Sequence, residues 1–378
     1  MNQFESLGLA TPILKALETE GYTVPTPIQT QAIPHILLGR DVQGIAQTGT
    51  GKTAAFALPI LHRLLQDRRP TKPKSCRVLV LSPTRELASQ IAESFRSYGR
   101  QTGLRAALMF GGVPKSKQAK AVANGIDVLV ATPGRLMDHM QDGAIRLNET
   151  EILVLDEADH MLDLGFIIPI RKIVQTIPPQ RQTLFFSATM PKEIASLAAQ
   201  MLRNPVHVAV NPVATTAERV EQKVIFVETA RKRQVLADIL RNAKMSRTLV
   251  FTRTKHGADR VTQHLEAVGQ PAAAIHGDKS QPQRERALAA FKAGRIRVLV
   301  ATDIAARGID VDGVTHVVNF DLPNVPEAYV HRIGRTARAG HTGIAISFCD
   351  SSERANLRGI EKLIRTRLMV EEPQSLAA

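Results

Sequence analysis

The chain has 378 residues, 44% of them hydrophobic, and a formal net charge of +14. A single hydrophobic core rarely organises so long a chain, so two domains are expected. The positive charge favours a polyanionic partner, either nucleic acid or an anionic membrane surface. Because the chain has no Trp and only 3 Tyr, we do not expect recognition to be dominated by bases stacked on aromatic side chains.

Cys76 and Cys349 are the 2 cysteines of the chain, too few for a disulfide framework and without the histidine pattern of a zinc site. They fall in strand-like runs, and such sparse cysteine use is typical of the reducing cytoplasm, where we expect the protein. The N-terminal stretch lacks the basic start and apolar core of a secretory signal, and no apolar run could span a bilayer. We therefore expect no association with membranes. We also expect a monomer.

Short apolar runs alternate with longer helical patterns along the whole chain. Buried strands separated by helices are typical of mostly parallel sheets with helices on both faces, so an α/β fold is predicted. We expect helices at 86–100 and 255–268, and strands at 77–82, 127–131, 151–156, 183–187, 223–227, 248–252, 297–302 and 316–320.

The segment 202–223 breaks this rhythm, because it carries prolines and small polar residues without a helical period. We therefore predict a first domain at 1–212, a linker at 213–220 and a second domain at 221–378, each of ordinary domain size. "DVLVATPGRL" (127–136) and "RVLVATDIAARG" (297–308) form a faint internal echo, which favours two similar halves.

"AQTGTGKT" (46–53) follows a short strand and opens a helical pattern, although Ala46 stands where the first glycine of a phosphate loop often stands. Glycines let backbone N–H groups close around phosphate oxygens, and the helix N-terminus adds positive potential. Lys52 would reach the β- and γ-phosphates of ATP, and Thr53 would hold Mg²⁺. The alternative is a glycine-rich turn. The remaining predicted ATP-binding residues of the loop are Gln47, Thr48, Gly49, Thr50 and Gly51.

"ILVLDEADHML" (152–162) places carboxylates directly after an apolar strand, beside a neighbouring phosphate loop in this kind of sheet. Asp156 would bind Mg²⁺, and Glu157 would orient and deprotonate the attacking water. The alternative is a charged helix N-terminus, where Asp and Glu are also favoured. The phosphate loop upstream favours the catalytic interpretation.

With these motifs in place, the chain resembles a DEAD-box RNA helicase core over nearly its full length. "DEAD" (156–159) is the motif that names that family. The other motifs follow the family's order: "GYTVPTPIQ" (21–29), "AQTGTGKT" (46–53), "PTRELASQ" (83–90), "GG" (111–112), "TPGRL" (132–136), "SAT" (187–189), "VFTRT" (250–254), "HGDKSQPQR" (276–284), "ATDIAARGID" (301–310) and "HRIGRTARAG" (331–340). "ARGID" and "HGDKSQ" look most like bacterial members of the RhlE type. The resemblance implies two tandem RecA-like domains, with ATP between them and single-stranded RNA across both.

The resemblance also assigns roles at the nucleotide. Gln29 would read the adenine edge, since an amide pairs a donor with an acceptor. Phe4 stands at the place of the family's adenine-stacking aromatic, and an ordinary core phenylalanine is the alternative. Asp310 would hold the ribose.

Arg335 and Arg338 resemble the family's arginine fingers, which reach the γ-phosphate and stabilise the charge that spreads in phosphoryl transfer. The alternative for an Arg-x-x-Arg spacing is a solvated helix face. Ala337 stands where many members of the family have glycine. We expect it to perturb little if it is helical.

By the same resemblance, RNA contacts fall on loops, where glycine lets the backbone approach phosphates and Thr or Arg side chains bind them. For Arg85 and Arg135 individually, a solvated basic residue is the alternative. The predicted RNA-binding residues are Pro83, Thr84, Arg85, Gly111, Gly112, Thr132, Arg135, Gly277, Arg284, Thr302 and Arg307.

Ser187 and Thr189 follow a buried strand, so their hydroxyls should lie at its C-terminal end. There they can bond a carboxylate such as Asp159, or His331 from the other domain, and couple nucleotide state to RNA. A Ser/Thr turn that satisfies its own backbone is the alternative.

The predicted activity is ATP-dependent, Mg²⁺-requiring separation of short RNA duplexes, with single-stranded RNA as the bound partner. An ATP-gated RNA clamp, or an assembly factor with little unwinding, fits the same motifs. A DNA helicase is disfavoured by the RNA-type motif set.

Overall fold

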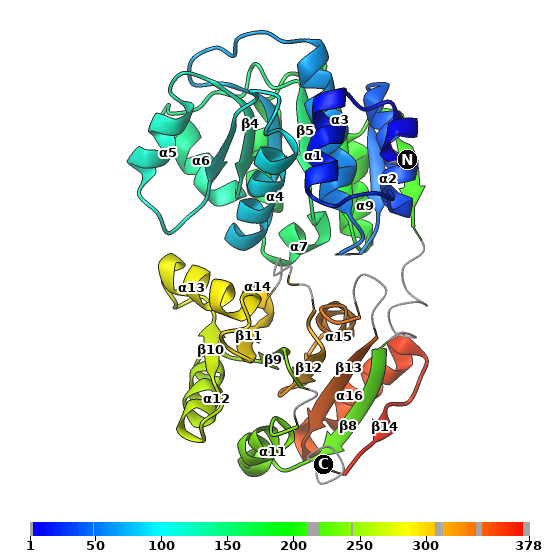
Figure 1. The fold of residues 1–378 in the computed structure, drawn as a ribbon, viewed down its shortest axis with the longest axis vertical. Coiled ribbons are helices and arrows are strands. Elements are labelled where there is room, and N and C mark those ends of the chain that lie inside the picture. Colours follow the sequence, from blue (N-terminus) through cyan, green and yellow to red (C-terminus); the bar gives the residue numbers. More distant parts are fainter. Residues whose placement is uncertain are drawn as a thin grey trace. The chain divides into compact units, whose positions relative to one another are not determined.

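The computed structural model describes residues 3–47, 49–210, 220–242, 245–306, 311, 313–337 and 342–372. The chain divides into two compact units, Met1–Asn211 and Pro212–Ala378. Of the predicted linker at 213–220, only Val220 lies within the described residues. The first strand of the second unit begins there. Each unit is built around its own sheet, with helices on its faces (Figure 1).

The first unit has a 7-stranded sheet in the order β3-β4-β2-β5-β6-β1-β7. Every pairing within it is parallel. The central strands β2, β5 and β6 are buried along their whole length, as expected for a sheet covered on both faces. The strands are β1 (Val42–Ile45), β2 (Cys76–Leu81), β3 (Ala106–Met109), β4 (Ile126–Ala131), β5 (Ile152–Leu155), β6 (Gln182–Ser187) and β7 (Val206–Ala209).

Alternate residues along these strands face two separate cores. Val80 and Phe186 pack with the helices α1 to α4 and the short η1, whereas Leu81 and Phe185 pack with α5 to α9 on the opposite face. The helices are η1 (Gln3–Leu7), α1 (Thr11–Thr19), α2 (Pro27–Leu37), α3 (Lys52–Gln66), α4 (Arg85–Tyr98), α5 (Lys115–Val122), α6 (Pro133–Gln141), α7 (Ala158–Asp163), α8 (Ile167–Gln175) and α9 (Lys192–Met201).

The second unit repeats this topology with a 7-stranded sheet in the order β10-β11-β9-β12-β13-β8-β14. Its pairings are also all parallel, and β8 to β14 take the places of β1 to β7 in turn. The two segments of the internal echo begin with β4 and β11, which are equivalent strands. The strands are β8 (Val220–Phe226), β9 (Thr248–Thr252), β10 (Ala272–Ile275), β11 (Val298–Thr302), β12 (His316–Asn319), β13 (Gly343–Cys349) and β14 (Met369–Val370).

The second sheet is also covered on both faces. Val250 and Phe348 pack with α11 and α12, whereas Phe251 and Cys349 belong to the cores formed with α13 to α16 on the other side. The helices are η2 (Thr229–Arg231), α11 (Lys232–Ile239), α12 (Lys255–Ala267), α13 (Gln281–Lys292), α14 (Asp303–Ala306), α15 (Pro326–Ile333), η3 (Ser351–Glu353) and α16 (Arg354–Ile364).

The predicted α/β fold class is confirmed, and the predicted strands lie where the sequence placed them. The short strands β3, β7, β10 and β14 were not predicted. β7 lies inside the segment 202–223, whose residue pattern predicts no regular element before the linker. It is an edge strand of 4 residues with one buried position, so it lacks the continuous apolar run that identifies a central strand.

Candidate functional site

Three neighbouring strands of the first sheet bring the predicted nucleotide motifs together. The order β5-β6-β1 places Asp156 directly after β5, Ser187 at the end of β6, and the phosphate loop after β1. All three strands are parallel, so these groups meet at one edge of the sheet. The carboxyl ends of parallel strands are where open α/β sheets bind their ligands.

The loop between β1 and α3 has a backbone suited to phosphate. Gly49 and Gly51 have φ angles of 83° and 91°, in the left-handed region that glycine adopts without a steric penalty. The helix α3 begins at Lys52, so its N-terminus faces the loop, as anion binding requires. The buried Nζ of Lys52 donates to the carbonyl of Ala46 at 2.8 Å, a partner that phosphate oxygens would replace.

The remaining loop residues support this arrangement. Thr50 Oγ1 donates to the carbonyl of Gln47 at 2.7 Å, which braces the loop from within. Thr53 is the second residue of α3 and is half-buried. Thr48, also predicted to bind ATP, lies outside the described residues.

Gln29 connects the phosphate loop to the start of α2. Its Oε1 accepts from the backbone N–H of Thr26 at 2.9 Å, and its Nε2 donates to the carbonyl of Gly51 at 3.1 Å. A Cβ atom at Gly51 would overlap the Gln29 amide and crowd Thr26, so only glycine fits there. The amide is held against the loop, and its reading of adenine stays a prediction.

Phe4 belongs to the hydrophobic core of the first unit in this structure. Its residue is 1% exposed and packs in the same cluster as Leu9, Ile13 and Ile28. Stacking on adenine would require one face of the ring to be uncovered. Phe4 thus lies in the core, and its stacking on adenine stays a prediction.

Asp156 and Glu157 occupy the turn between β5 and α7. Asp156 Oδ1 accepts from the backbone N–H of Glu157 at 3.0 Å. Burial raises the pKa of Asp156 to about 6, although the nearby positive charge of Lys52 lowers it. Glu157 has φ 52° and ψ 54°, a left-handed conformation that is costly for a residue with a side chain and is often found at functional sites.

The donors at this edge suit Mg²⁺, which prefers hard oxygen ligands and is often held by one carboxylate together with substrate phosphates. The buried carboxylate of Asp156 and the hydroxyl of Thr53, at the start of α3, are donors of that kind. Among the described residues, no group of three or more His, Cys, Asp or Glu side chains could hold a metal alone.

The SAT segment is joined to the DEAD segment by several hydrogen bonds. Asp159 Oδ2 accepts from both the backbone N–H and the Oγ1 of Thr189, each at 2.8 Å. The Oγ of Ser187 accepts from the backbone N–H of Asp159 at 3.1 Å. These contacts are the geometry expected between the two segments. His331 lies on α15 of the second unit, and its link to them stays a prediction.

The predicted RNA residues of the first unit gather in two connected groups. In the first, the Thr84 hydroxyl caps α4 by accepting from the Leu87 N–H at 3.3 Å, directly after the buried Pro83. The Arg85 guanidinium lies against Gly111 and Gly112, where a Cβ atom would crowd it at Gly111 and overlap it at Gly112. Gly112 also has a φ angle of 84°, so glycine is favoured there on both grounds.

The second group lies at the start of α6. Thr132 is the N-cap of that helix. Arg135 Nη1 donates to the carbonyl of Val113 at 2.8 Å, which holds the segment after the glycine pair. Arg135 is therefore tied to the other predicted RNA residues and is not a loose solvated side chain.

In the second unit, predicted RNA residues again lie near strand ends. Gly277 follows His276, whose Nε2 lies 3.0 Å from Asp259 Oδ1. Thr302 is the last residue of β11, and Arg284 lies on α13. Arg335 follows α15, and its Nε donates to the carbonyl of His331 at 3.3 Å. The predicted residues Arg307, Asp310 and Arg338 lie outside the described residues.

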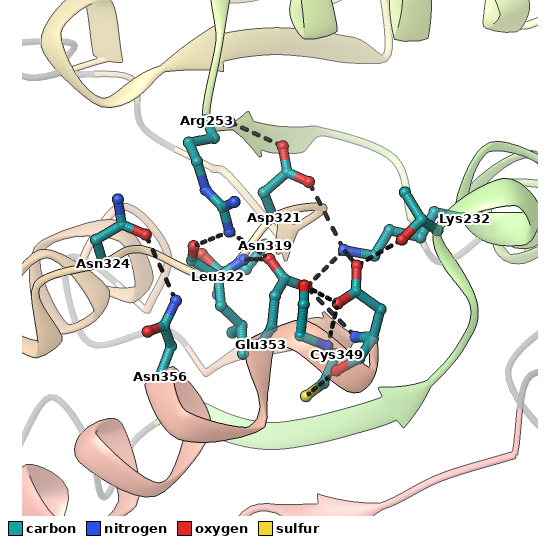
Figure 2. A network of polar contacts seen from close by, with 12 residues as sticks. Lys232, Arg253, Asn319, Asp321, Leu322, Asn324, Cys349, Glu353 and Asn356 are labelled. Atoms are coloured by element: carbon teal, nitrogen blue, oxygen red, sulfur yellow. Dashed lines mark hydrogen bonds and ion pairs between the residues drawn. The ribbon is translucent and has the colours of Figure 1, made fainter.

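A buried charge network, not anticipated from the sequence, occupies the corresponding edge of the second sheet (Figure 2). Lys232 is 1% exposed, and its Nζ lies 2.6 Å from Glu353, 3.4 Å from Asp350 and 3.6 Å from Asp321. Arg253, from the "VFTRT" motif, donates to Glu353 at 2.7 Å, and its backbone N–H donates to Asp321 at 2.9 Å.

Arg332 extends this network toward α14. It contacts both carboxylate oxygens of Asp303, at 2.5 and 2.7 Å. It also donates to Asn319 Oδ1 at 3.1 Å and to the carbonyl of Asp321 at 2.7 Å. The guanidinium lies over the Phe251 ring, 5.0 Å from its centroid. Arg332 thus fixes α15, the helix that precedes Arg335.

Comparison with known proteins identifies the family to which this chain belongs. The profile of the DEAD/DEAH box helicase family matches residues 26–197, and that of the helicase conserved C-terminal domain matches residues 231–340. The chain is 42% identical over 371 residues to the ATP-dependent RNA helicase CshA of Limosilactobacillus reuteri, covering 98% of this chain and 74% of that protein. The chain belongs to the DEAD-box family of ATP-dependent RNA helicases.

Other DEAD-box proteins support the same conclusion. The DEAD-box ATP-dependent RNA helicase CshA of Bacillus anthracis is 43% identical over 368 residues, with 97% of this chain and 69% of that protein covered. The structure of S. cerevisiae Dbp5 bound to RNA and ADP BeF3 superimposes with a TM-score of 0.85 at 32% identity, covering 99% of this chain and 97% of the other. The finer resemblance to RhlE-type members stays a prediction.

The condition under which Ala337 was expected to perturb little is not met in this DEAD-box chain. Ala337 is not helical, because its φ angle is 55°, in the left-handed region where glycine is favoured and a Cβ atom is costly. The sequence alone signalled only that glycine is usual here.

The two cysteines lie in strands as expected. Both are free and buried, and burial raises the pKa of the Cys76 thiol to about 12. No helix in the described part of the chain is long and apolar enough to cross a bilayer.

Proposed function

We propose that this helicase core hydrolyses ATP at the strand-end edge of its first sheet, is stimulated by single-stranded RNA, and uses the cycle to separate short duplexes locally. The observation that carries this proposal is the meeting of the phosphate loop, Asp156–Glu157 and Ser187 at the ends of three adjacent parallel strands. The free, buried cysteines support a reducing cytoplasmic location.

Nucleotide binding is assigned to residues that already surround the loop. Lys52 would exchange the Ala46 carbonyl for the β- and γ-phosphate oxygens, and the N–H groups of Gly49 to Thr53 would bind the others. Gln29 would turn its amide toward adenine while its helix remains next to the loop. Asp156 and Thr53 would hold Mg²⁺, which supplies positive charge to the phosphates.

Hydrolysis is assigned to Glu157. The water oxygen attacks the γ-phosphorus, the bond from that phosphorus to the bridging oxygen of ADP breaks, and Glu157 takes a proton from the water. Arg335 and Arg338 neutralise the charge that spreads over the transferred phosphoryl group. The products are ADP and inorganic phosphate.

RNA binding is assigned to the glycine, threonine and arginine positions in both units, which contact backbone phosphates. The bonds from Thr189 and Ser187 to the DEAD segment provide the route from nucleotide state to this surface. ATP and RNA raise each other's affinity if both favour one arrangement of the units, since such coupling is reciprocal.

The test is Glu157→Gln. It removes the base but keeps the shape, so RNA-stimulated hydrolysis should fall by roughly 10²- to 10⁴-fold, the contribution of a positioned base. Binding of a fluorescent ATP analogue should be retained, and multiple-turnover duplex separation should stop. Glu193→Gln, an exposed change on α9, is the matched control.

Wild-type hydrolysis by Glu157→Gln would remove Glu157 from the role of base. Two further measurements on the unaltered protein address the alternatives. Equal stimulation by single-stranded DNA of matched sequence would count against RNA as the activator. RNA-stimulated ATP turnover without multiple-turnover strand separation would favour the clamp.

A further inference from the structure

A histidine that directly follows the four-residue DEAD motif contacts the proposed general base. His160 lies in the first turn of α7, three residues after Glu157, and its Nδ1 is 3.2 Å from Glu157 Oε2. Both residues are buried, at 5% and 6% exposure. An ionised carboxylate only accepts hydrogen bonds, so Nδ1 carries the proton when Glu157 is charged.

This contact does not serve to cap the helix. Glu157 is the N-cap of α7, but its side chain accepts no hydrogen bond from the N–H groups of the first turn. The carboxylate bends toward the imidazole instead. Because Glu157 adopts a left-handed backbone conformation, its side chain leaves the chain in a direction that a helical residue would not take. His160 then bonds one end of that carboxylate.

A purely structural histidine would be an unfavourable choice here. His160 Nε2 is buried and has no hydrogen-bond partner among the described residues, so the ring carries a polar atom that a phenylalanine or leucine would not. The ring cannot easily move away, because Met161 beside it is fully buried and α7 packs against β6 and α9. The bond to Glu157 therefore accounts for an imidazole at this place.

We propose that His160 is a positioning residue for ATP hydrolysis: its Nδ1–H holds Oε2 of Glu157 and thereby aims Oε1 at the attacking water. This inference rests on the proposed role of Glu157 as the base. Holding one oxygen fixes the rotation of the carboxylate, and misplacement of a catalytic group by about 1 Å lowers rates roughly 10²-fold. Nucleotide binding, which uses the phosphate loop, does not depend on this bond.

The experiment compares two replacements of His160 in the full chain. His160→Phe fills the space without a donor, and RNA-stimulated kcat should fall by about 10- to 100-fold with little change in KM for ATP. His160→Asn places an amide N–H near the position of Nδ1, and it should recover most of that loss. Equilibrium binding of a fluorescent ATP analogue and thermal unfolding are measured for each variant.

The matched control is His62→Phe. His62 lies on the same unit, in α3, ten residues after Lys52 and hence about 15 Å along the helix from the phosphate loop. It is partly buried, so it tests the general cost of replacing a histidine by phenylalanine in this unit. Its kcat should stay at the wild-type value.

Combining His160→Phe with Glu157→Gln in one chain separates this inference from the proposed function. If His160 acts through Glu157, adding His160→Phe to Glu157→Gln should lower kcat no further, because residues that act as a unit are not additive. Wild-type kcat in His160→Phe, together with an inactive Glu157→Gln, would overturn the inference alone. Equal losses in His160→Phe and His160→Asn would also overturn it, since they would reflect packing. Wild-type turnover in Glu157→Gln would overturn both.

Discussion

The two sheets share one strand order, but they treat the charges at their C-terminal edges in opposite ways. In the first unit, Asp156 follows β5, and burial raises the pKa of its carboxyl group to about 6. In the second unit, Asp321 follows the equivalent strand β12 and is bonded by Lys232 and by the backbone of Arg253. At the first edge burial outweighs the charge of Lys52, whereas at the second edge the carboxylates are in direct contact with Lys232 and Arg253.

This difference teaches how one fold provides two functions. A buried carboxylate without compensation costs free energy, which a bound cation or a nucleotide complex can offset. A buried carboxylate paired with lysine and arginine acts as scaffolding, because removing one partner leaves the other unpaired. The first edge is thus suited to binding, and the second holds α15 and the arginine after it.

The substitution expected to have the largest effect is Arg335→Ala, which tests the role given to the second unit. If the second unit is scaffolding that presents Arg335, together with Arg338, to the nucleotide, loss of Arg335 should lower RNA-stimulated turnover by about 10³-fold, the scale of an arginine finger. ATP affinity should change much less, because the first unit provides the phosphate loop. The measurement is kcat and KM at saturating RNA, with the exposed Arg241→Ala as control. Near-normal turnover would return Arg335 to the solvated-face interpretation.

The scaffold itself is tested by Lys232→Met. Methionine fills the space but leaves Asp321, Asp350 and Glu353 without their shared cation, and breaking a buried ion pair costs about 3 to 5 kcal/mol. Calorimetry should show the loss in the transition of the second unit, with the first unit unchanged. Lys292→Met, at an exposed position of α13, is the control. A loss below about 1 kcal/mol would mean that the network is not the scaffold proposed.

The two edges should respond to pH in opposite directions, because the pKa of Asp156 is raised and the pKa of Asp350 is lowered. The pKa of Asp156 in the folded protein is raised above its value of about 3.9 in the unfolded chain. The protonated carboxyl therefore stabilises the fold fully below about pH 3.9, and this stabilisation is lost as pH rises to about 6. Relative to wild type, Asp156→Asn should therefore gain stability between about pH 4 and pH 6, up to roughly 3 kcal/mol. The unfolding free energy is measured without Mg²⁺ or nucleotide.

Asp350 should behave in the reverse manner. Burial alone would raise its pKa, but hydrogen bonds from Ser352 and Thr229 and the charge of Lys232 hold that pKa well below the ordinary value. Its stabilisation is present above about pH 3.9 and is lost as pH falls through the folded value. Asp350→Asn should lose stability at neutral pH, and the difference from wild type should shrink in acid. Curves of the same sign for both variants would contradict the comparison.

The smallest effect concerns backbone conformation. Glu157 and Ala337 both have positive φ angles, one in each unit, but only Glu157 has a side chain assigned to the chemistry. Ala337→Gly should remove the strain and raise the unfolding free energy of the second unit by about 1 kcal/mol, with kcat little changed. Thermal unfolding and turnover on one preparation decide this. A decrease in stability would show that the alanine is not strained.

The sequence predicted the fold class and most of the strands, because central parallel strands are continuous apolar runs. It also located the phosphate loop and the DEAD segment, whose residue types are specific to their chemistry. It could not predict the network around Lys232, since five residues scattered from α11 to η3 meet only after the sheet forms. His160 reads as one residue of a helix, and only the fold shows that its ring contacts Glu157. The core position of Phe4 and the backbone angle of Ala337 likewise depend on packing.

The strand order has a consequence for how the chain folds as it is synthesised. β1 pairs with β6 and β7, and the contact between Asp41 and Thr183 beside it spans 142 residues. At synthesis rates of about 5 to 20 residues per second, β1 waits roughly 7 to 28 s for its first partner. The second sheet should show a similar delay, because the hydrogen bond between Thr229 and Asp350 spans 121 residues. Each sheet can close only after nearly all of its unit has left the ribosome, so the first unit can complete its fold while most of the second is still being made.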